Sequence, residues 1–217
     1  MPVKNIARIG KDIKRKIMNT MASEKPADSE KIRELYSNII FSVIKSRRST
    51  RKYLEYDVPD ELLKKVLDAA GYAPSAGNFQ PYEFIVVKNA DMRKHIAEAC
   101  KQDWMAEAPV HIIACTNMKI ASIYEERGMK LYGIQDTAMA VGNLMLAAES
   151  LGLRTCWVGA FGEAQVSILL QCPEYVRPAA IITLGYSDEK VKEPPKHGIE
   201  KFAHREKFGE RWKRGET

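Results

Sequence analysis

The sequence predicts a single domain in which helices and strands are intermixed. The chain has 217 residues, enough for one sizeable hydrophobic core and short for two. Apolar residues make up 45% and charged residues 29% of the chain, which is the ordinary globular range and excludes a disordered or low-complexity class. Helix-period and strand-period patterns alternate, and two helical patterns precede the first strong strand pattern.

Five segments in the body of the chain have a helical pattern, the first over residues 30–46. Pro59 suits the start of a helix over 60–70 that Gly71 ends, and Asn89 suits the N-cap of a helix over 90–101. The longest helix is expected over 132–150, closed by Gly152, and a short one over 163–170. The residues expected to face the core are Ile32, Leu35, Tyr36, Ile39, Ile40 and Val43 in the first helix, and Ala138, Val141, Met145 and Ala148 in the longest.

Four apolar runs predict strands, over residues 82–87, 110–115, 154–158 and 179–184. The last part of the chain, 187–217, is polar, contains prolines and has no regular pattern. The chain shows no internal repeat, no dinucleotide-binding GxGxxG pattern and no P-loop pattern.

Residues 1–20 form a basic amphipathic pattern, with Ile6, Ile9, Ile13 and Ile17 on one helical stripe. They carry +5 of the formal net charge of +6, so the rest of the chain is near neutral and no basic face for nucleic acid is expected. Packing of this helix on the protein, on the other subunit by preference, is favoured over an anionic membrane surface or a frayed tail. A polar linker is expected over residues 22–30, which divides the chain into an extension, 1–29, and a domain, 30–217.

No apolar run approaches the length of about 18 residues that a membrane-spanning helix needs, and the N-terminus lacks the features of a secretory signal. The four cysteines, Cys100, Cys115, Cys156 and Cys172, form no CxxC pair, so no metal site is expected. Free thiols and the absence of a signal favour a cytoplasmic location.

A cationic segment follows the first helix of the body: Arg47-Arg48-Ser49-Thr50-Arg51-Lys52-Tyr53. Arginine forks and hydroxyl groups match phosphate oxygens, so the segment is a candidate phosphate site. The alternative is a solvated charge run, because cations are favourable at any helix C-terminus.

Two further segments offer small or amide-bearing groups. The first, residues 73–82, has Pro74, Gly77 and Pro81 to fix a loop that presents Ser75, Asn78 and Gln80, whose hydroxyl and amide groups suit a planar heterocycle edge. In the second, Gly159 and Ala160 would let backbone N–H groups approach a flat ligand. Ordinary turns would explain both segments equally well.

Taken together and in order, RRSxRxY at 47–53, APSxxNxQPY at 73–82 and WxGxF at 157–161 resemble the FMN-dependent nitroreductase family. The resemblance covers roughly residues 40–209. It implies an α+β fold with a mixed sheet between helices, and an interlocked homodimer with FMN at each side of the interface.

The resemblance also implies roles for individual residues. Arg47, Arg48 and Ser49 match phosphate and ribityl ligands, and Arg51 matches the basic residue near flavin N1 and O2, an electrostatic role rather than a proton-transfer one. Asn78 matches the amide that faces the flavin ring, with Gln80 in the same motif.

Two further sets complete the implied site. Pro74 and Ser75 match contacts from the partner subunit, and Gly159 and Ala160 match the backbone pair near N5 and O4. Lys196, or else His197, takes the place of the basic residue that closes the phosphate site ahead of Glu206-Lys207-Phe208-Gly209.

The function implied is an oxidoreductase that passes two electrons from NADH or NADPH through FMN to a small aromatic, quinone or nitro acceptor, in a ping-pong cycle. Residues 102–132 are expected to set acceptor choice, with Trp104, Tyr124 and Met129 as possible stacking groups. A reductive dehalogenase or flavin-modifying enzyme, or a membrane-attached flavin-binding protein with little turnover, remains an alternative.

Overall fold

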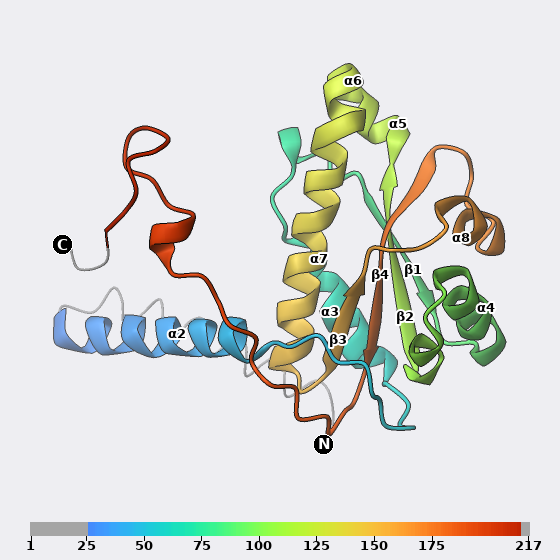
Figure 1. Cartoon of the computed structure of the whole chain (residues 1–217), viewed down its shortest axis with the longest axis horizontal. Coiled ribbons are helices and arrows are strands. Elements are labelled where there is room, and N and C mark those ends of the chain that lie inside the picture. Colours follow the sequence, from blue (N-terminus) through green and yellow to red (C-terminus); the bar gives the residue numbers. More distant parts are fainter. Residues whose placement is uncertain (1–25, 214–217) are drawn as a thin grey trace.

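A computed structural model describes residues 26–213 of the chain. It has a four-stranded sheet between two layers of helices, which is the predicted α+β class (Figure 1). The predicted amphipathic helix over residues 1–20 lies outside the described residues. No helix in the described part of the chain is long and apolar enough to span a membrane.

The sheet contains β1 (Tyr82–Val87), β2 (Val110–Asn117), β3 (Arg154–Val158) and β4 (Val176–Gly185), in the order β1-β2-β4-β3. All three strand pairs are antiparallel, and the parallel component of the expected mixed sheet is an isolated bridge between Ser49 and Thr155. All four strands lie where the sequence predicted them, but β2 and β4 are longer. The β2–β4 register shifts between Ala114 and Cys115, where Pro178 cannot donate a ladder hydrogen bond.

One face of the sheet is covered by α3 (Asp60–Gly71) and α7 (Gly133–Ser150). Ile112, Ile182 and Leu184 point from the central strands into this layer and are fully buried. Pro59 is the residue before α3, as expected. In α7, Val141, Met145 and Ala148 are buried as predicted, whereas Ala138 is exposed because the inner stripe of the helix runs through Ala140 and Leu144 instead.

The opposite face is covered by α4 (Ala90–Cys100) and α8 (Glu163–Leu169). The predicted cap of α4 is confirmed, because the Asn89 side chain accepts a hydrogen bond from the Met92 N–H at 2.9 Å. Every residue of β2 is buried, since helices cover both of its faces. Short helical pieces complete the body: η1 (Ala76–Asn78), η2 (Asp103–Glu107), α5 (Met118–Ala121), η3 (Ser122–Tyr124), α6 (Glu125–Arg127) and η4 (Gly128–Tyr132).

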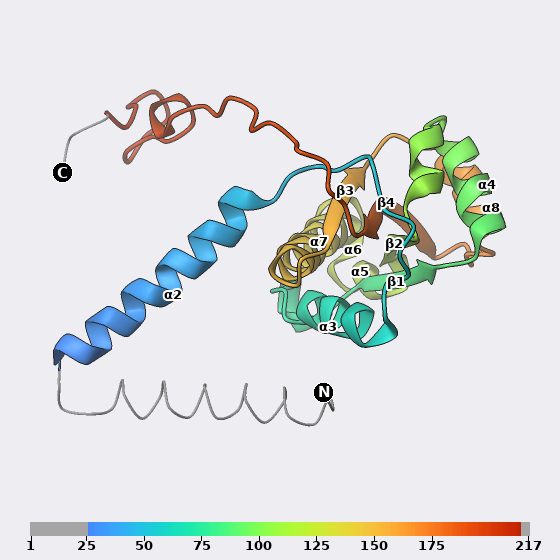
Figure 2. The same cartoon turned by 90° about the horizontal axis from the view of Figure 1, so that it is seen from below.

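The helix α2 (Pro26–Ser46) projects away from this body (Figures 1 and 2). It begins inside the linker expected over 22–30, because proline suits a first helical position. The expectation that its apolar residues face the chain's own core is wrong: Leu35, Ile39 and Ile40 are 58%, 51% and 56% exposed. The periodicity identified an amphipathic helix correctly, but the surface it would pack on is absent from the described part of its own chain.

The C-terminal segment, residues 187–213, is irregular as predicted apart from η5 (Ile199–Lys201). We call it the C-terminal arm. It leaves the sheet after β4 and extends on the same side of the body as α2 (Figures 1 and 2). Phe202 and Phe208 on the arm are 66% and 91% exposed. In the described part of the chain, the arm and α2 therefore each have an exposed apolar surface.

His111 is a fully buried titratable residue at the start of β2. Its Nε2 lies 2.8 Å from the Met105 carbonyl oxygen, whereas Nδ1 has no hydrogen-bond partner among the described residues. Burial lowers the pKa of His111 from 6.5 to about 4, with a smaller contribution from the charge of Arg93 and an opposing one from the Met105 carbonyl. The imidazole is therefore neutral in the folded protein at pH values where the unfolded chain protonates it.

We expect His111 to make the protein acid-sensitive between about pH 6.5 and pH 4. In this window the unfolded state binds the extra proton, so the free energy of unfolding falls as the pH falls, by up to about 1.4 kcal/mol per pH unit. Urea titrations across the window should show a shallower slope for His111→Leu than for the wild type. An equal slope in His111→Leu and the wild type would contradict this assignment.

Candidate cofactor-binding site

The cationic segment predicted from the sequence lies along the outer edge of β3. The Thr50 N–H donates to the Thr155 carbonyl at 3.1 Å, beside the bridge between Ser49 and Thr155. Tyr53 fixes the far end of the segment, because its hydroxyl lies 2.8 Å from both the Thr50 carbonyl and the Thr183 Oγ1. Burial raises the pKa of Tyr53, so the hydroxyl stays protonated and can serve both contacts.

Arg47, Ser49 and Arg51 surround the buried thiol of Cys156 on β3. Burial raises the pKa of Cys156, and the charges of Arg51 and Arg47 and a hydrogen bond with Ser49 act in the opposite direction. The Arg47 side chain is half-buried, and no described residue accepts a hydrogen bond from its guanidinium. The structure thus brings three of the predicted ligands together, and the guanidinium of Arg47 remains available to bind a ligand.

Arg48 has a different environment from its neighbours. Its guanidinium donates to the carbonyl oxygens of Lys45 and Arg47 and lies 3.0 Å from a carboxylate oxygen of Glu193. These contacts tie the end of α2 to the beginning of the C-terminal arm. Arg48 therefore has fewer donors left for a ligand than Arg47 has.

Glu189 is part of this site and was missed by the sequence reasoning. Its Oε2 accepts hydrogen bonds from the backbone N–H groups of Arg51 at 2.8 Å and Lys52 at 3.2 Å. Ser187 completes the clamp by donating to the Lys52 carbonyl at 2.6 Å. Glu189 lies in the polar run after β4, more than 130 residues beyond the cationic segment. Nothing in the sequence indicates that the two are in contact.

Gly159 and Ala160 form an exposed turn after β3. A Cβ added at Gly159 would make only ordinary contacts with Trp157, the nearest at 3.6 Å, so the packing of the chain itself does not require glycine here. No described backbone carbonyl accepts a hydrogen bond from the N–H groups of this pair. The turn thus leaves an open space and free donors, which is what a flat ligand with acceptor atoms requires.

The loop of Pro74, Ser75, Asn78 and Gln80 has a preformed and unusual shape. Asn78 and Gln80 have φ values of 58° and 50°, in the left-handed region that non-glycine residues rarely adopt. The Ser75 hydroxyl accepts from the Gln80 N–H at 3.0 Å, and the Gln80 amide donates to the Asn78 side chain at 3.2 Å. Strained backbone held in this way is typical of functional loops.

The structure does not bring this loop to the cationic segment of the same chain. The Ala76 N–H donates to the Asp136 carboxylate in the first turn of α7, whereas Thr50 is bonded to Thr155, beyond the last turn of that helix. The span from Asp136 to Ser150 is roughly 21 Å at 1.5 Å per residue. The two sets of predicted ligands lie at opposite ends of α7.

Lys196 and His197 are on the C-terminal arm, where both are exposed, and neither contacts a residue of the cationic segment among the hydrogen bonds and ion pairs of the described chain. The residues expected to set acceptor choice are also divided. Tyr124 packs on Phe79, with ring centroids 5.8 Å apart, beside the strained loop. Trp104 lies against Arg51 instead, with the guanidinium 5.7 Å from its ring centroid. A site built from all of these residues would need a second chain.

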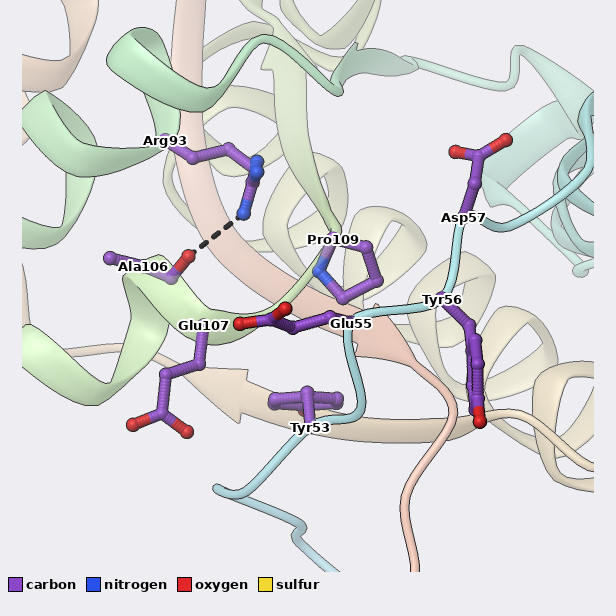
Figure 3. Close-up of a pocket in the computed structure, with 8 residues that line it drawn as sticks. All are labelled: Tyr53, Glu55, Tyr56, Asp57, Arg93, Ala106, Glu107 and Pro109. Carbon is purple, nitrogen blue, oxygen red and sulfur yellow. Dashed lines mark hydrogen bonds between the residues drawn. The ribbon is translucent and has the colours of Figure 1, made fainter.

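A cavity of about 570 Å³ lies beside Tyr53, which lines it (Figure 3). Arg93 is the one cation among the described residues that line it, and it donates to the Ala106 carbonyl at 2.8 Å and to the Ala108 carbonyl. Three carboxylates line the same space, so it does not suit a phosphate group. The lining residues are Tyr53, Glu55, Tyr56, Asp57, Arg93, Ala106, Glu107 and Pro109.

No group of three His, Cys, Asp or Glu residues suited to a metal ion occurs in the described part of the chain.

Replacement of Glu189 should test the clamp on the cationic segment. Glu189→Ala removes a charged acceptor from two backbone N–H groups, so we expect the free energy of unfolding to fall by about 1–3 kcal/mol. Glu189→Gln keeps an acceptor oxygen and should lose less. The control Glu163→Ala breaks the exposed pair with Arg177 and should cost under about 1 kcal/mol in urea titrations. Equal losses for both alanine variants would show that Glu189 does not act as a clamp.

Comparison with known proteins supports the family resemblance that the motifs suggested. The model of the nitroreductase family matches residues 44–105 and 97–186. A relative from Methanothermobacter thermautotrophicus, whose name includes NAD(P)H nitroreductase, is 39% identical over 155 residues, which are 69% of this chain and 78% of that protein. The FMN reductase (NAD(P)H) of Bacillus subtilis is 32% identical over 186 residues, covering 79% of this chain and 75% of its own.

A solved structure has the same fold. It is an FMN-dependent nitroreductase from Clostridium difficile, with a TM-score of 0.67 and 27% identity, and the match covers 76% of this chain and 98% of that one. The family match extends over both the cationic segment and the strained loop. The chain belongs to the nitroreductase family.

Proposed function

We propose that the protein is an FMN-dependent oxidoreductase that takes two electrons from NADH or NADPH and passes them to a small aromatic, quinone or nitro acceptor. Family membership and the names of the relatives support this class of reaction. The observation that carries the proposal is the cluster of Arg47, Ser49 and Arg51 on the edge of β3, together with the open turn at Gly159 and Ala160 that follows the same strand. It combines donors for a phosphate with backbone donors for a flat ring.

The cationic segment is suited to hold the phosphate end of FMN. Arg47 offers two parallel N–H donors, and the hydroxyl of Ser49 adds a third group of the same polarity. Lys196 or His197 would close the phosphate site from the C-terminal arm, as the resemblance implies. Arg48, which is bound to Glu193, would mainly keep the arm in place.

When bound, FMN supplies hydride transfer at N5 and acquires negative charge at N1 on reduction. Arg51 would place its positive charge where that negative charge develops, which stabilises the reduced form. The N–H groups of Gly159 and Ala160 would donate to acceptor atoms at the ring edge. Since the sequence has no separate dinucleotide-binding fingerprint, the two substrates would use the same open face in turn, in a ping-pong cycle.

A homodimer would complete the site. The apolar faces of α2 and of the C-terminal arm are exposed in one chain, and burying an isoleucine or phenylalanine is worth about 1.5–3 kcal/mol. A second copy would cover these faces and bring its Pro74, Ser75, Asn78 and Gln80 toward the cationic segment. Each site would then contain groups from both chains.

The identity of the cofactor tests the function directly. The purified protein should be yellow, lose its flavin absorbance when NADH or NADPH is added without oxygen, and regain it when a quinone or nitroaromatic compound follows. Acid should release FMN, identified by chromatography against FAD and riboflavin standards. Recovery of FAD, or of no flavin after reconstitution, would contradict the proposal.

Arg47→Ala should weaken FMN binding through the loss of phosphate contacts. A charge-assisted hydrogen bond is worth about 1.5–3 kcal/mol, so the dissociation constant should rise about 10- to 150-fold. Riboflavin, which lacks the phosphate, should bind both proteins with equal affinity. The control Arg177→Ala, on the far end of β4, should leave both constants unchanged; an unchanged FMN constant in Arg47→Ala would identify the cluster as solvated surface.

The dimer can be tested on α2. Ile40→Asp puts a charge on the exposed apolar face, and we expect sedimentation to show a monomer that has lost its FMN. Asn38→Asp adds the same charge about 200° away around the helix and should remain dimeric and yellow. A flavin-loaded and active monomer, in either variant or in the wild type, would refute the composite site.

A further inference from the structure

Trp104 and Gln102 connect two parts of the site that are far apart in the sequence. The Arg51 guanidinium lies 5.7 Å from the Trp104 ring centroid, and the indole N–H of Trp104 donates to the Gln102 Oε1 at 3.2 Å. The Gln102 Nε2 then donates to the Ala160 carbonyl at 3.4 Å. A continuous chain of contacts thus joins Arg51 to the turn at Gly159 and Ala160.

The direction of these hydrogen bonds fixes the Gln102 amide. An indole N–H can only donate and a carbonyl can only accept, so the amide oxygen must face Trp104 and the amide nitrogen must face Ala160. A flipped amide would place donor against donor and acceptor against acceptor. The contact with Trp104 and the contact with Ala160 therefore restrain each other through the Gln102 amide.

The connecting residues are themselves anchored to rigid parts of the fold. Trp104 packs on the core between the sheet and α4, next to Met105, which is fully buried. The backbone N–H of Gln102 donates to the Ala97 carbonyl at 3.1 Å, at the end of α4. Arg51 is restrained at its backbone by Glu189 and at its guanidinium by Trp104.

The geometry points to Trp104 and Gln102 as positioning residues that hold the charge of Arg51 and the peptide of Ala160 in one fixed relation, and thereby tune the redox potential of the flavin. The inference rests on the proposed function, in which both groups contact the ring. It also gives Trp104 a role other than stacking on the acceptor, because one face of its ring is already turned to Arg51.

A rigid Arg51 stabilises the reduced flavin more than a mobile one, because its charge is already in place when the negative charge appears. A cation–π contact at a partly exposed site is worth about 0.5–1 kcal/mol, which corresponds to about a two- to fivefold change in an equilibrium constant. Trp104→Leu should therefore weaken the binding of reduced FMN about two- to fivefold relative to oxidised FMN. The midpoint potential should fall by the equivalent amount, and by less than in Arg51→Met.

The experiment measures midpoint potentials and FMN dissociation constants for single and double variants of the dimer. The midpoint potential should fall in Trp104→Leu. It should fall less in Trp104→Phe, which keeps a ring over Arg51. In the double variant, Trp104→Leu should lower the potential no further than Arg51→Met alone does. The matched control is Tyr175→Leu, which removes another cation–π contact, with Lys119, at the opposite end of β2. It should leave the potential unchanged.

A second readout needs no flavin. In spectra of the flavin-free protein, Gln102→Leu should move the indole N–H resonance of Trp104, while those of the other two tryptophans stay in place. Loss of FMN binding in the wild type would contradict the proposed function but leave this shift intact. Normal FMN binding together with an unchanged potential in Trp104→Leu, or additive effects of Trp104→Leu and Arg51→Met, would overturn the inference.

Discussion

The site depends on one constraint, the attachment of residues 47–54 to the edge of the sheet. The backbone bonds from Thr50 to Thr155 and from Leu54 to Tyr186 attach the segment at two points, and the part-buried hydroxyl of Tyr53 adds contacts with Thr50 and Thr183. Without these bonds the arginines would lie on an unattached segment after the C-terminus of α2, where cations are solvated. With them, the charges are gathered over Cys156, and the first residues of the C-terminal arm are aligned alongside.

The elements of the fold were largely predictable from local pattern. The four strands, the Asn89 cap and the helix over 132–150 all lie near their predicted positions, because alternation and capping are properties of short segments. The packing of α2 was not predictable. Periodicity shows that Leu35, Ile39 and Ile40 share a face, but it does not show which surface that face meets, and all three are exposed in the described part of the chain. The stripe of α7 was misplaced at Ala138 for the related reason that alanine suits either face of a helix.

The candidate site was predictable in its motifs and not in its connections. The types and order of Arg47, Ser49, Arg51 and Asn78 carried the family resemblance. The partners that restrain Arg51, namely Glu189 and Trp104, come from segments whose sequence contains no motif, and only the folded sheet brings them together. The division of the predicted ligands between the two ends of α7 is also a property of the fold alone. Under the proposed function, a second chain would supply the loop that one chain holds away from the cationic segment.

The cationic segment has a further consequence for the physical behaviour of the protein. In the order β1-β2-β4-β3, β3 is an edge strand, and an uncovered edge offers unpaired backbone groups to any other extended chain. The bridge at Ser49 occupies that edge, and the charges of Arg47 and Arg51 lie on either side of it along the segment. A strand from another molecule would have to displace a bonded segment and approach these two cations. The residues that we propose as phosphate ligands thus also protect the sheet against aggregation through its edge.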